Sequence, residues 1–328
     1  MGKRLFVFLA ILVLALPAVL VPFHVDIRTY RADAAVSPAE HLALRTAAIT
    51  GRSRLLTAIG ETGSQQVVAG KEDFLFFAET LPDFQGGGLT DGETQVLTEK
   101  LLALQQALAD EGRELIVLIA PNKNAIYPEM MPLHILPAET DGLARVNAAL
   151  AEAGLNVLDA RAILLAGKAE GLVYFRGDSH WNARGARLVY QELMRMTGTS
   201  APDYAGVPLK EGQAGDLTLL CQPGTSPMEA DAEPDIPRVY RTQRPMRSLN
   251  DARIQTTSET TPLSMLVVRD SFGAGLFPYL ANTVGKLVFS RSDEDVAHQA
   301  AGAGVDWVVV EVVQRNLRDW LRDGALIP

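Results

Sequence analysis

The sequence has almost no cysteine, and this scarcity limits what the chain can build. Cys221 is the single cysteine among 328 residues, so neither an intrachain disulfide nor a cysteine-based metal cluster can form. Positive charge is also in short supply, because 30 Lys and Arg stand against 39 Asp and Glu and leave a net charge of −9. Nucleic-acid binding requires a basic face that neutralises phosphates, so we expect no nucleic-acid partner.

Long apolar runs are scarce after the N-terminus, which carries the longest one. Lys3 and Arg4 precede an apolar run over residues 5–23, about the length of 20 residues that a membrane helix needs. We expect an uncleaved signal anchor over residues 1–27, because a polar stretch separates the run from the Ala-Asp-Ala sequence at 32–34. A cleaved signal peptide is the alternative. Basic residues before the run predict that the remainder lies across the membrane, in the periplasm and held to the inner membrane.

The rest of the chain alternates between two periodicities. After a connecting helical segment at residues 28–64, residues 65–328 alternate short apolar runs, such as 114–120, with amphipathic patterns, such as 90–111. This alternation predicts an α/β fold with a mainly parallel sheet and helices on both faces. Residues 201–262 break the pattern and are predicted to be an insertion within this domain.

One serine lies where this architecture keeps its ligands. Residues 263–268 form a run, apolar except at Ser264, that indicates a buried strand, and a helical pattern begins at Phe272 and extends to Leu280. Ser271 is therefore predicted at the carboxyl end of a parallel strand. The helix N-terminus beside it offers free N–H groups to a developing oxyanion.

A second loop supplies a candidate base. Asp178 and His180 follow an apolar stretch at 172–175, read as a strand, and precede a helix that Asn182 could cap. Two positions apart in a tight loop, the carboxylate can hold the Nδ1–H of the imidazole and leave Nε2 free for a serine proton. From the residues alone other readings stay open, since a serine can be a helix cap and a histidine a surface residue. Asp178 and His180 could also share a metal, although none of the chain's other four histidines lies at ligand spacing.

Several segments in a fixed order also carry a family resemblance. They are Gly-Asp-Ser-His-Trp at 177–181, Val-Arg-Asp-Ser-Phe at 268–272, Gly-Lys-Glu-Asp-Phe-Leu-Phe at 70–76, a Pro-Asn-Lys with a later Tyr-Pro at 121–128, and an apolar run at 309–317. Together they resemble the alginate O-acetyltransferase family of the AlgJ/AlgX type, which has an SGNH-hydrolase-like domain. The resemblance implies a three-layer α/β/α sandwich and a serine–histidine–aspartate enzyme.

The resemblance assigns roles to individual residues. It implies that Ser271 is the nucleophile, His180 the general base and Asp178 its orienting carboxylate. Arg269 stands where an ordinary SGNH serine block has glycine, Ser179 where the family often has His or Thr, and Asp73 in place of a glycine.

Substrate contacts are predicted around these residues. For the oxyanion we expect the N–H groups around Ser271 and Phe272, with Asn122 as a side-chain candidate. Trp181 could stack on a sugar, and Lys123 and Arg176 could contact an anionic glycan. Packing and solvated surface charge are the respective alternatives.

The expected function is O-acetylation of an exported or cell-envelope polysaccharide through an acyl-serine, with no cofactor and no metal. The resemblance implies a membrane-bound O-acyltransferase partner that delivers the acetyl group. Two alternatives remain open from the sequence. The same residues could serve a carbohydrate acetylesterase, or the chain could be a non-catalytic glycan-binding component of an export complex.

Overall fold

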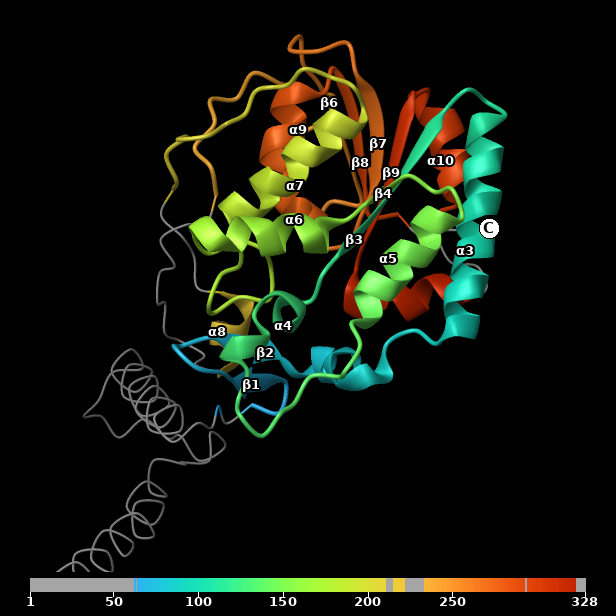
Figure 1. Cartoon of the computed structure of the whole chain (residues 1–328). Coiled ribbons are helices and arrows are strands. Elements are labelled where there is room, and N and C mark those ends of the chain that lie inside the picture. The colour runs from blue at the N-terminus through green and yellow to red at the C-terminus, as the bar shows by residue number, and fades with distance from the viewer. Residues whose placement is uncertain (1–61, 63, 211–214, 222–232, 293, 323–328) are drawn as a thin grey trace, which may run out of the picture.

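A seven-stranded sheet forms the centre of the protein (Figure 1). The computed structural model describes residues 62, 64–210, 215–221, 233–292 and 294–322. The strand order is β4-β3-β9-β7-β8-β6-β5. In chain order the strands of this sheet are β3 (Glu114–Ala120), β4 (Val157–Leu158), β5 (Arg241–Thr242), β6 (Arg253–Thr257), β7 (Ser264–Val268), β8 (Lys286–Ser290) and β9 (Trp307–Val313).

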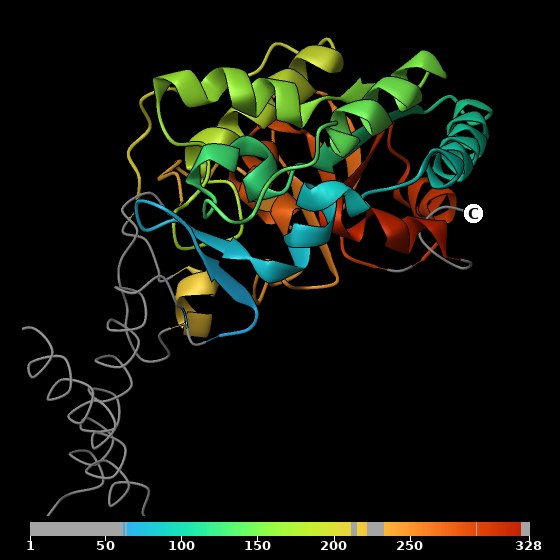
Figure 2. The same cartoon turned by 60° about the horizontal axis from the view of Figure 1, so that its bottom comes forward.

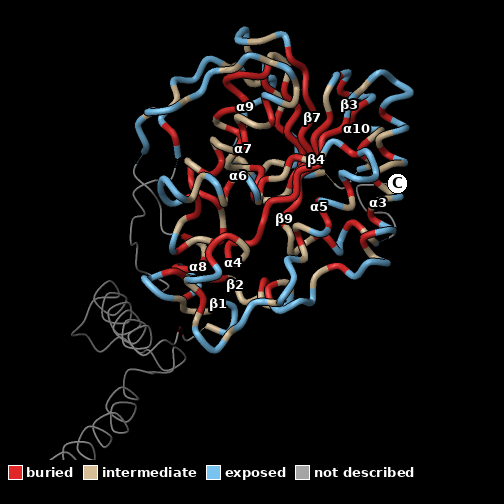
Figure 3. The backbone as a smooth tube through the Cα atoms, in the orientation of Figure 1, coloured by how far each residue is buried: buried red, intermediate tan, exposed pale blue. Residues whose placement is uncertain are grey.

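Helices cover both faces of the sheet, as the alternating pattern predicted. Figure 1 shows α6, α7 and α9 on one side and α3, α5 and α10 on the other. The helices are α3 (Asp91–Ala109), α4 (Lys123–Ile126), α5 (Gly142–Glu152), α6 (Ala160–Gly167), α7 (Ala183–Met196), α8 (Asp216–Cys221), α9 (Phe277–Thr283) and α10 (Val296–Ala303). Successive residues of β3 enter different cores, Ile116 and Leu118 under α6 and α7 and Val117 under α3 and α5. The central strands are consequently buried on both faces, as Figure 3 shows.

The middle of the sheet is parallel, which confirms the predicted fold class. Strand β7, all of whose residues are buried, pairs in parallel with β8 and with β9. Parallel strands end at the same edge, so the residues that follow β3, β7 and β9 are neighbours. This shared edge positions the site described below.

The segment at 201–262 is not wholly separate from the domain. Strands β5 and β6 lie in it and extend the central sheet as antiparallel edge strands, β6 pairing with β8. Neither strand has a strong sequence signal, because β5 has only two residues and β6 (Arg-Ile-Gln-Thr-Thr) is polar on its exposed positions.

One strand predicted from the sequence does not form. Residues 172–175 were read as a strand, but among the described residues Tyr174 makes only an isolated antiparallel bridge to Trp181. Val173 and Tyr174 are buried in the core beneath α6 and α7, where packed side chains cover them and no strand pairing is needed. The Asp178 loop therefore approaches the sheet edge from outside the sheet.

The hairpin of β1 (Val67–Ala69) and β2 (Leu75–Phe77) lies beside α8 below the sheet edge (Figures 1 and 2). Its turn places Glu72 at φ 52° and Asp73 at φ 63°. Positive φ favours glycine, which explains the glycine that the family resemblance places at residue 73; aspartate is among the residues that tolerate this conformation best.

The predicted anchor at 1–27 and almost all of the connecting segment at 28–64 lie outside the described residues. Within the described ranges, every helix falls short of the length or apolar content that crossing a membrane requires.

Candidate active site

Ser271 lies in a sharp turn after the buried strand β7. The turn leads directly into the 3₁₀ helix η7 (Phe272–Leu276), followed by α9, so the helix predicted over 272–280 is divided in two. Pro278 near the start of α9 explains the division, because proline has no N–H to continue a helix from the preceding turn.

The turn is held by a carboxyl group from the neighbouring strand. Glu311 of β9 accepts hydrogen bonds on Oε2 from the N–H of Asp270 at 3.1 Å and of Gly273 at 3.0 Å. Burial, and then the nearby Asp270 carboxylate, raises the pKa of Glu311 well above its ordinary value. A Cβ at position 273 would come within 2.6 Å of the Arg269 side chain, so this position requires glycine.

Arg269, which replaces the glycine of ordinary SGNH serine blocks, is buried behind the turn. Its guanidinium lies 4.5 Å from the Phe289 ring centroid and donates to the carbonyls of Asp270, at 3.0 Å, and of Leu249. Burial lowers the pKa of Arg269 to about 10, so it remains a cation at neutral pH. Arg269 therefore connects the turn to the segment before β6.

The loop with Asp178 and His180 is held from both sides. Asn182 caps α7 as predicted, accepting the Gly185 N–H at 3.0 Å, and also donates to the Leu172 carbonyl at 2.9 Å. On the other side the Lys123 ammonium donates to the carbonyls of residues 175, 176 and 178, at 3.1, 2.8 and 2.7 Å. Lys123 is only 4% exposed. It shapes this loop and does not reach the surface, which corrects its predicted role as a glycan contact.

The two loops meet, and three side chains form a continuous relay. His180 Nδ1 lies 2.7 Å from Asp178 Oδ1, and His180 Nε2 lies 2.9 Å from Ser271 Oγ. Burial alone would raise the pKa of Asp178, but the hydrogen bond and charge of His180 outweigh it and bring that pKa below its ordinary 3.8. The carboxylate is thus ionised at neutral pH, and it fixes the proton on Nδ1 so that Nε2 can accept one from the serine.

A third acid, which the sequence reading missed, contacts this relay. Asp216, the first residue of α8, donates its N–H to Asp178 Oδ2 at 2.9 Å. Its carboxylate accepts the Ser179 N–H at 2.7 Å and the Ser179 hydroxyl at 2.5 Å. Asp216 lies in the irregular 201–262 region, where composition alone does not single out one acid from several.

These acids raise the question of a metal site. Ligand atoms from Asp178, His180 and Asp216 lie within 4.8 Å of one another. However, both oxygens of each carboxylate already accept hydrogen bonds, and Nδ1 is bound to Asp178. A metal would have to displace these bonds and break the relay, so the donor set fits acid–base chemistry better.

Two of the three predicted oxyanion donors already have hydrogen-bond partners within the protein. The Phe272 N–H donates to Asp270 Oδ1 at 2.8 Å. This hydrogen bond within the loop competes with any ligand for the Phe272 N–H. Asn122 also uses its side-chain N–H₂, which donates to Asp83 Oδ2 at 2.9 Å. The Ser271 N–H makes no hydrogen bond to another described residue, so it is the remaining predicted donor.

Aromatic rings pack around the imidazole. The Phe272 ring lies 4.6 Å from the His180 ring and 5.3 Å, edge to face, from the Trp181 ring. Trp181 is only 2% exposed, and a Cβ at Gly275 would come within 2.6 Å of its Nε1. Trp181 therefore supports the position of His180, and its ring offers too little surface for the predicted stacking on a sugar.

Two arginines flank this aromatic cluster. Arg176, a predicted glycan contact, is exposed, with its guanidinium 5.8 Å from the Phe74 ring centroid. Arg315, which the sequence reading missed, places its guanidinium 5.4 Å from the Phe272 ring and 5.3 Å from the Phe77 ring. Arg315 forms no ion pair with any residue in the described part of the chain, so it can pair with an anionic substituent of a substrate.

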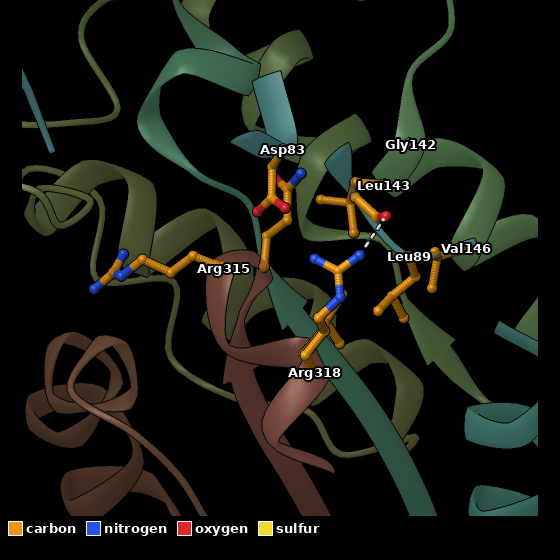
Figure 4. A pocket seen from close by; sticks show the side chains of 10 residues that line it. Asp83, Leu89, Gly142, Leu143, Val146, Arg315 and Arg318 are labelled. Atoms are coloured by element: carbon orange, nitrogen blue, oxygen red, sulfur yellow. Dashed lines mark hydrogen bonds between the residues drawn. The ribbon is translucent and has the colours of Figure 1, made fainter. Parts of the chain in front are cut away.

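The residues that line a nearby pocket make structural contacts. It is lined by Asp83, Arg315 and Arg318 among others, and Figure 4 shows the Arg315 side chain extending away from Arg318. Arg318 pairs with Glu93 at 3.0 Å and donates to the carbonyls of residues 87 and 88, so its charge and donors are used. Arg318 therefore connects the chain before α3 to the segment that follows β9.

Known proteins resemble this chain in sequence and in fold. A family model described as the SGNH hydrolase-like domain of the acetyltransferase AlgX matches residues 67–303, well over half of the chain. The chain belongs to this family. The resemblance expected from the motifs is thereby confirmed, as is the SGNH-like α/β fold.

Two curated relatives of this AlgX-family chain are probable alginate O-acetylases. The chain is 31% identical over 145 residues to the probable alginate O-acetylase AlgJ of Pseudomonas syringae pv. tomato, covering 43% of this chain and 35% of that protein. The corresponding match to AlgJ of Pseudomonas aeruginosa is 32% over 133 residues, covering 40% and 33%. The chain thus spans about a third of the length of the curated relatives it matches.

Solved structures show the same fold at low identity. A DHHW family protein from Eubacterium siraeum aligns with a TM-score of 0.61 at 12% identity, covering 80% of this chain and 95% of that one. Bacillus cereus PatB1 with a sulfonyl adduct aligns with a TM-score of 0.57 at 15% identity, covering 76% and 94%. These matches support the fold alone.

Proposed function

We propose that this AlgX-family protein is an O-acetyltransferase that acetylates hydroxyl groups of an exported or cell-envelope polysaccharide through an acyl-serine intermediate. The observation that carries the proposal is the relay from Asp178 through His180 to Ser271, with both imidazole nitrogens at hydrogen-bond distance from their partners. An oriented imidazole is what turns a weakly nucleophilic serine into an attacking group.

In the first half of the reaction, Ser271 Oγ attacks the carbonyl carbon of an acetyl donor while His180 Nε2 takes the serine proton. The oxyanion that forms faces the Ser271 N–H. As the bond to the donor's leaving group breaks, His180 returns the proton to that group, and the acetyl group stays on Ser271 as an ester.

In the second half, a sugar hydroxyl takes the place of the departed group. His180 Nε2 removes its proton, the hydroxyl oxygen attacks the acetyl carbonyl, and the bond to Ser271 Oγ breaks. The proton passes from His180 to Ser271, which restores the free enzyme. Asp178 stays ionised throughout and stabilises the imidazolium present in both transition states.

The proposed substrates rest on the named relatives, and the proposed location rests on the N-terminal sequence. The relatives named as probable alginate O-acetylases support a polysaccharide acceptor resembling alginate. We propose that a membrane-bound O-acyltransferase supplies the acetyl group and that an N-terminal anchor holds the protein in the periplasm.

The test combines a mimic donor with a sugar acceptor. The full chain is incubated with 4-nitrophenyl acetate, with and without an alginate oligosaccharide, and acetylated sugar and free acetate are measured. Transfer to sugar is expected for the wild type and should be lost in Ser271→Ala. Ser258→Ala, at the opposite end of the sheet beside the start of β8, removes a hydroxyl that bonds Thr260 and the Asn282 carbonyl, away from Ser271, and should behave as wild type.

Each other outcome contradicts the proposal in a specific way. Free acetate without acetylated sugar would identify the chain as a carbohydrate acetylesterase. Undiminished sugar acetylation in Ser271→Ala and His180→Ala would reject the relay as the catalyst, and binding of the oligosaccharide without any turnover would favour the non-catalytic glycan-binding role.

A further inference from the structure

A second carboxylate lies against the proton relay, and it comes from a part of the chain outside both sequence motifs. Asp216 belongs to α8, which packs against the β1–β2 hairpin and lies beside it in Figures 1 and 2. Asp216 Oδ2 lies 3.6 Å from His180 Nδ1, and Asp178 Oδ1 lies 2.7 Å from the same nitrogen. The imidazole edge that carries Nδ1 therefore faces two carboxylates.

The contacts of Asp216 link it to every residue of the Asp-Ser-His loop. Its N–H donates to Asp178, and its two carboxylate oxygens accept the N–H and the hydroxyl of Ser179. The Ser179 hydroxyl in turn lies 3.3 Å from His180 Nδ1. Ser179 is buried and the Asp216 side chain is 42% exposed, so the Ser179 end of these bonds is shielded from water and the Asp216 end is partly open.

Two cations near this loop are engaged by other groups. The Lys123 ammonium is used by the carbonyls of the loop, including that of Asp178. The Arg315 guanidinium packs on the Phe272 ring, whose centre is 4.6 Å from the imidazole centre. Ser271, on the Nε2 side, is neutral before the reaction begins. The electrostatic balance at Nδ1 is thus set mainly by Asp178 and Asp216.

We propose that Asp216 is a second positioning carboxylate of the acid–base unit. Through Ser179 it holds the loop in the geometry that aims Nε2 at Ser271, and across 3.6 Å its charge helps to stabilise the imidazolium that forms when Ser271 loses its proton. The proposal rests on the acyl-transfer function proposed above and adds to it a role for the inserted segment.

The decisive variant is Asp216→Asn, which removes the charge and keeps the shape. The amide oxygen can still accept the Ser179 N–H, and the backbone N–H to Asp178 is unaffected. With one negative charge fewer beside Nδ1, the protonated imidazole is less stabilised. We expect kcat/KM for 4-nitrophenyl acetate to fall by about 10-fold or more, and the acid limb of the pH–rate profile to move to lower pH by up to about one unit.

Two further variants separate charge from structure. Asp235→Asn removes an equal charge from the same inserted segment, where Asp235 forms only a 3.7 Å pair with Lys210, and should leave rate and profile unchanged. Ser179→Ala should lower kcat by about as much as Asp216→Asn, whereas Ser179→Thr, which restores a hydroxyl, should recover most of the rate. Thermal unfolding of each variant reports whether the fold is intact.

The outcomes distinguish this proposal from the function on which it rests. If Ser271→Ala still turns over the ester at the wild-type rate, the acyl-serine mechanism fails whatever Asp216 does. If Ser271→Ala is inactive but Asp216→Asn keeps the wild-type rate and acid limb, the second carboxylate is refuted and the function stands. A lower rate with an unmoved acid limb, or a loss shared equally by Asp235→Asn, also overturns the proposal.

Discussion

The carboxyl group of Glu311 provides a quantitative test of how the nucleophile turn is built. Glu311 is 1% exposed and accepts two backbone N–H groups on Oε2, one on each side of Ser271. Burial, followed by repulsion from Asp270, raises its pKa well above the ordinary 4.5. We therefore expect a neutral acid at physiological pH, and Glu311→Gln should reproduce its shape, its neutrality and its acceptor.

The sign and size of the effect follow from linkage between protonation and folding. A group whose pKa is raised by folding contributes stability below its unfolded value of 4.5, and that contribution falls as the pH rises toward the folded value. Each pH unit between the unfolded and folded values costs about 1.36 kcal/mol, so the wild type should lose stability through this group as the pH rises from about 5 toward 8. Glu311→Gln does not titrate and should lose none of it.

The assay is urea unfolding of both proteins, followed by tryptophan fluorescence across that pH range. The difference in unfolding free energy should change steadily in favour of Glu311→Gln as the pH rises, and ester turnover should stay close to wild type. Relative to Glu311→Gln, which also does not titrate, Glu311→Leu should cost roughly 2–6 kcal/mol at all pH values, because two buried N–H groups lose their acceptor at about 1–3 kcal/mol each. A difference between wild type and Glu311→Gln that does not vary with pH would mean that Glu311 is ionised, which would refute the reasoning.

Three other results follow from the same structure. Lys123→Met should lower kcat for the ester by at least about 100-fold, with the fold unchanged by circular dichroism. Three loop carbonyls lose a charged donor, and each such hydrogen bond is worth about 1.5–3 kcal/mol. Near-normal ester turnover would contradict this prediction. Arg315→Gln should reduce kcat/KM about 10-fold for an oligosaccharide that carries carboxylates and leave kcat/KM for a neutral oligosaccharide unchanged, because one charge-assisted contact is lost. Arg195→Gln, on the exposed end of α7, serves as the control. Equal losses on both oligosaccharides would exclude an anion contact. Dialysis against EDTA should leave turnover unchanged, since the three acid–base residues already bind one another, and a loss restored by added metal would reverse that conclusion.

Much of the fold could be predicted because its elements have strong local signals. The strand at 114–120 and the helix predicted at 90–111 were found within two residues, since each has an unambiguous apolar period and the helix has a Thr90 capping box. Residues 172–175 failed for the converse reason: a short apolar run looks the same whether a strand ladder or a helix layer covers it.

The meeting of Ser271 with His180 could be expected from order and motif, whereas their surroundings could not. Asp178 and His180 are two positions apart in sequence, and their hydrogen bond follows from a tight loop. Asp216 and Arg315 reach the site only through tertiary packing, one from an irregular insertion and one from the end of β9. The burial of Lys123 and Trp181 is likewise a property of the whole fold, because nothing local distinguishes an exposed lysine from one enclosed by carbonyls.

Covalent labelling of the serine tests the account most directly. The full chain is treated with a sulfonyl fluoride at neutral pH, digested, and the modified peptide located by mass spectrometry. We predict a single adduct on Ser271 that forms much more slowly in His180→Ala and not at all in Ser271→Ala. Labelling of Ser271 at the same rate without His180, or labelling only elsewhere, would contradict the claim that the imidazole activates this hydroxyl.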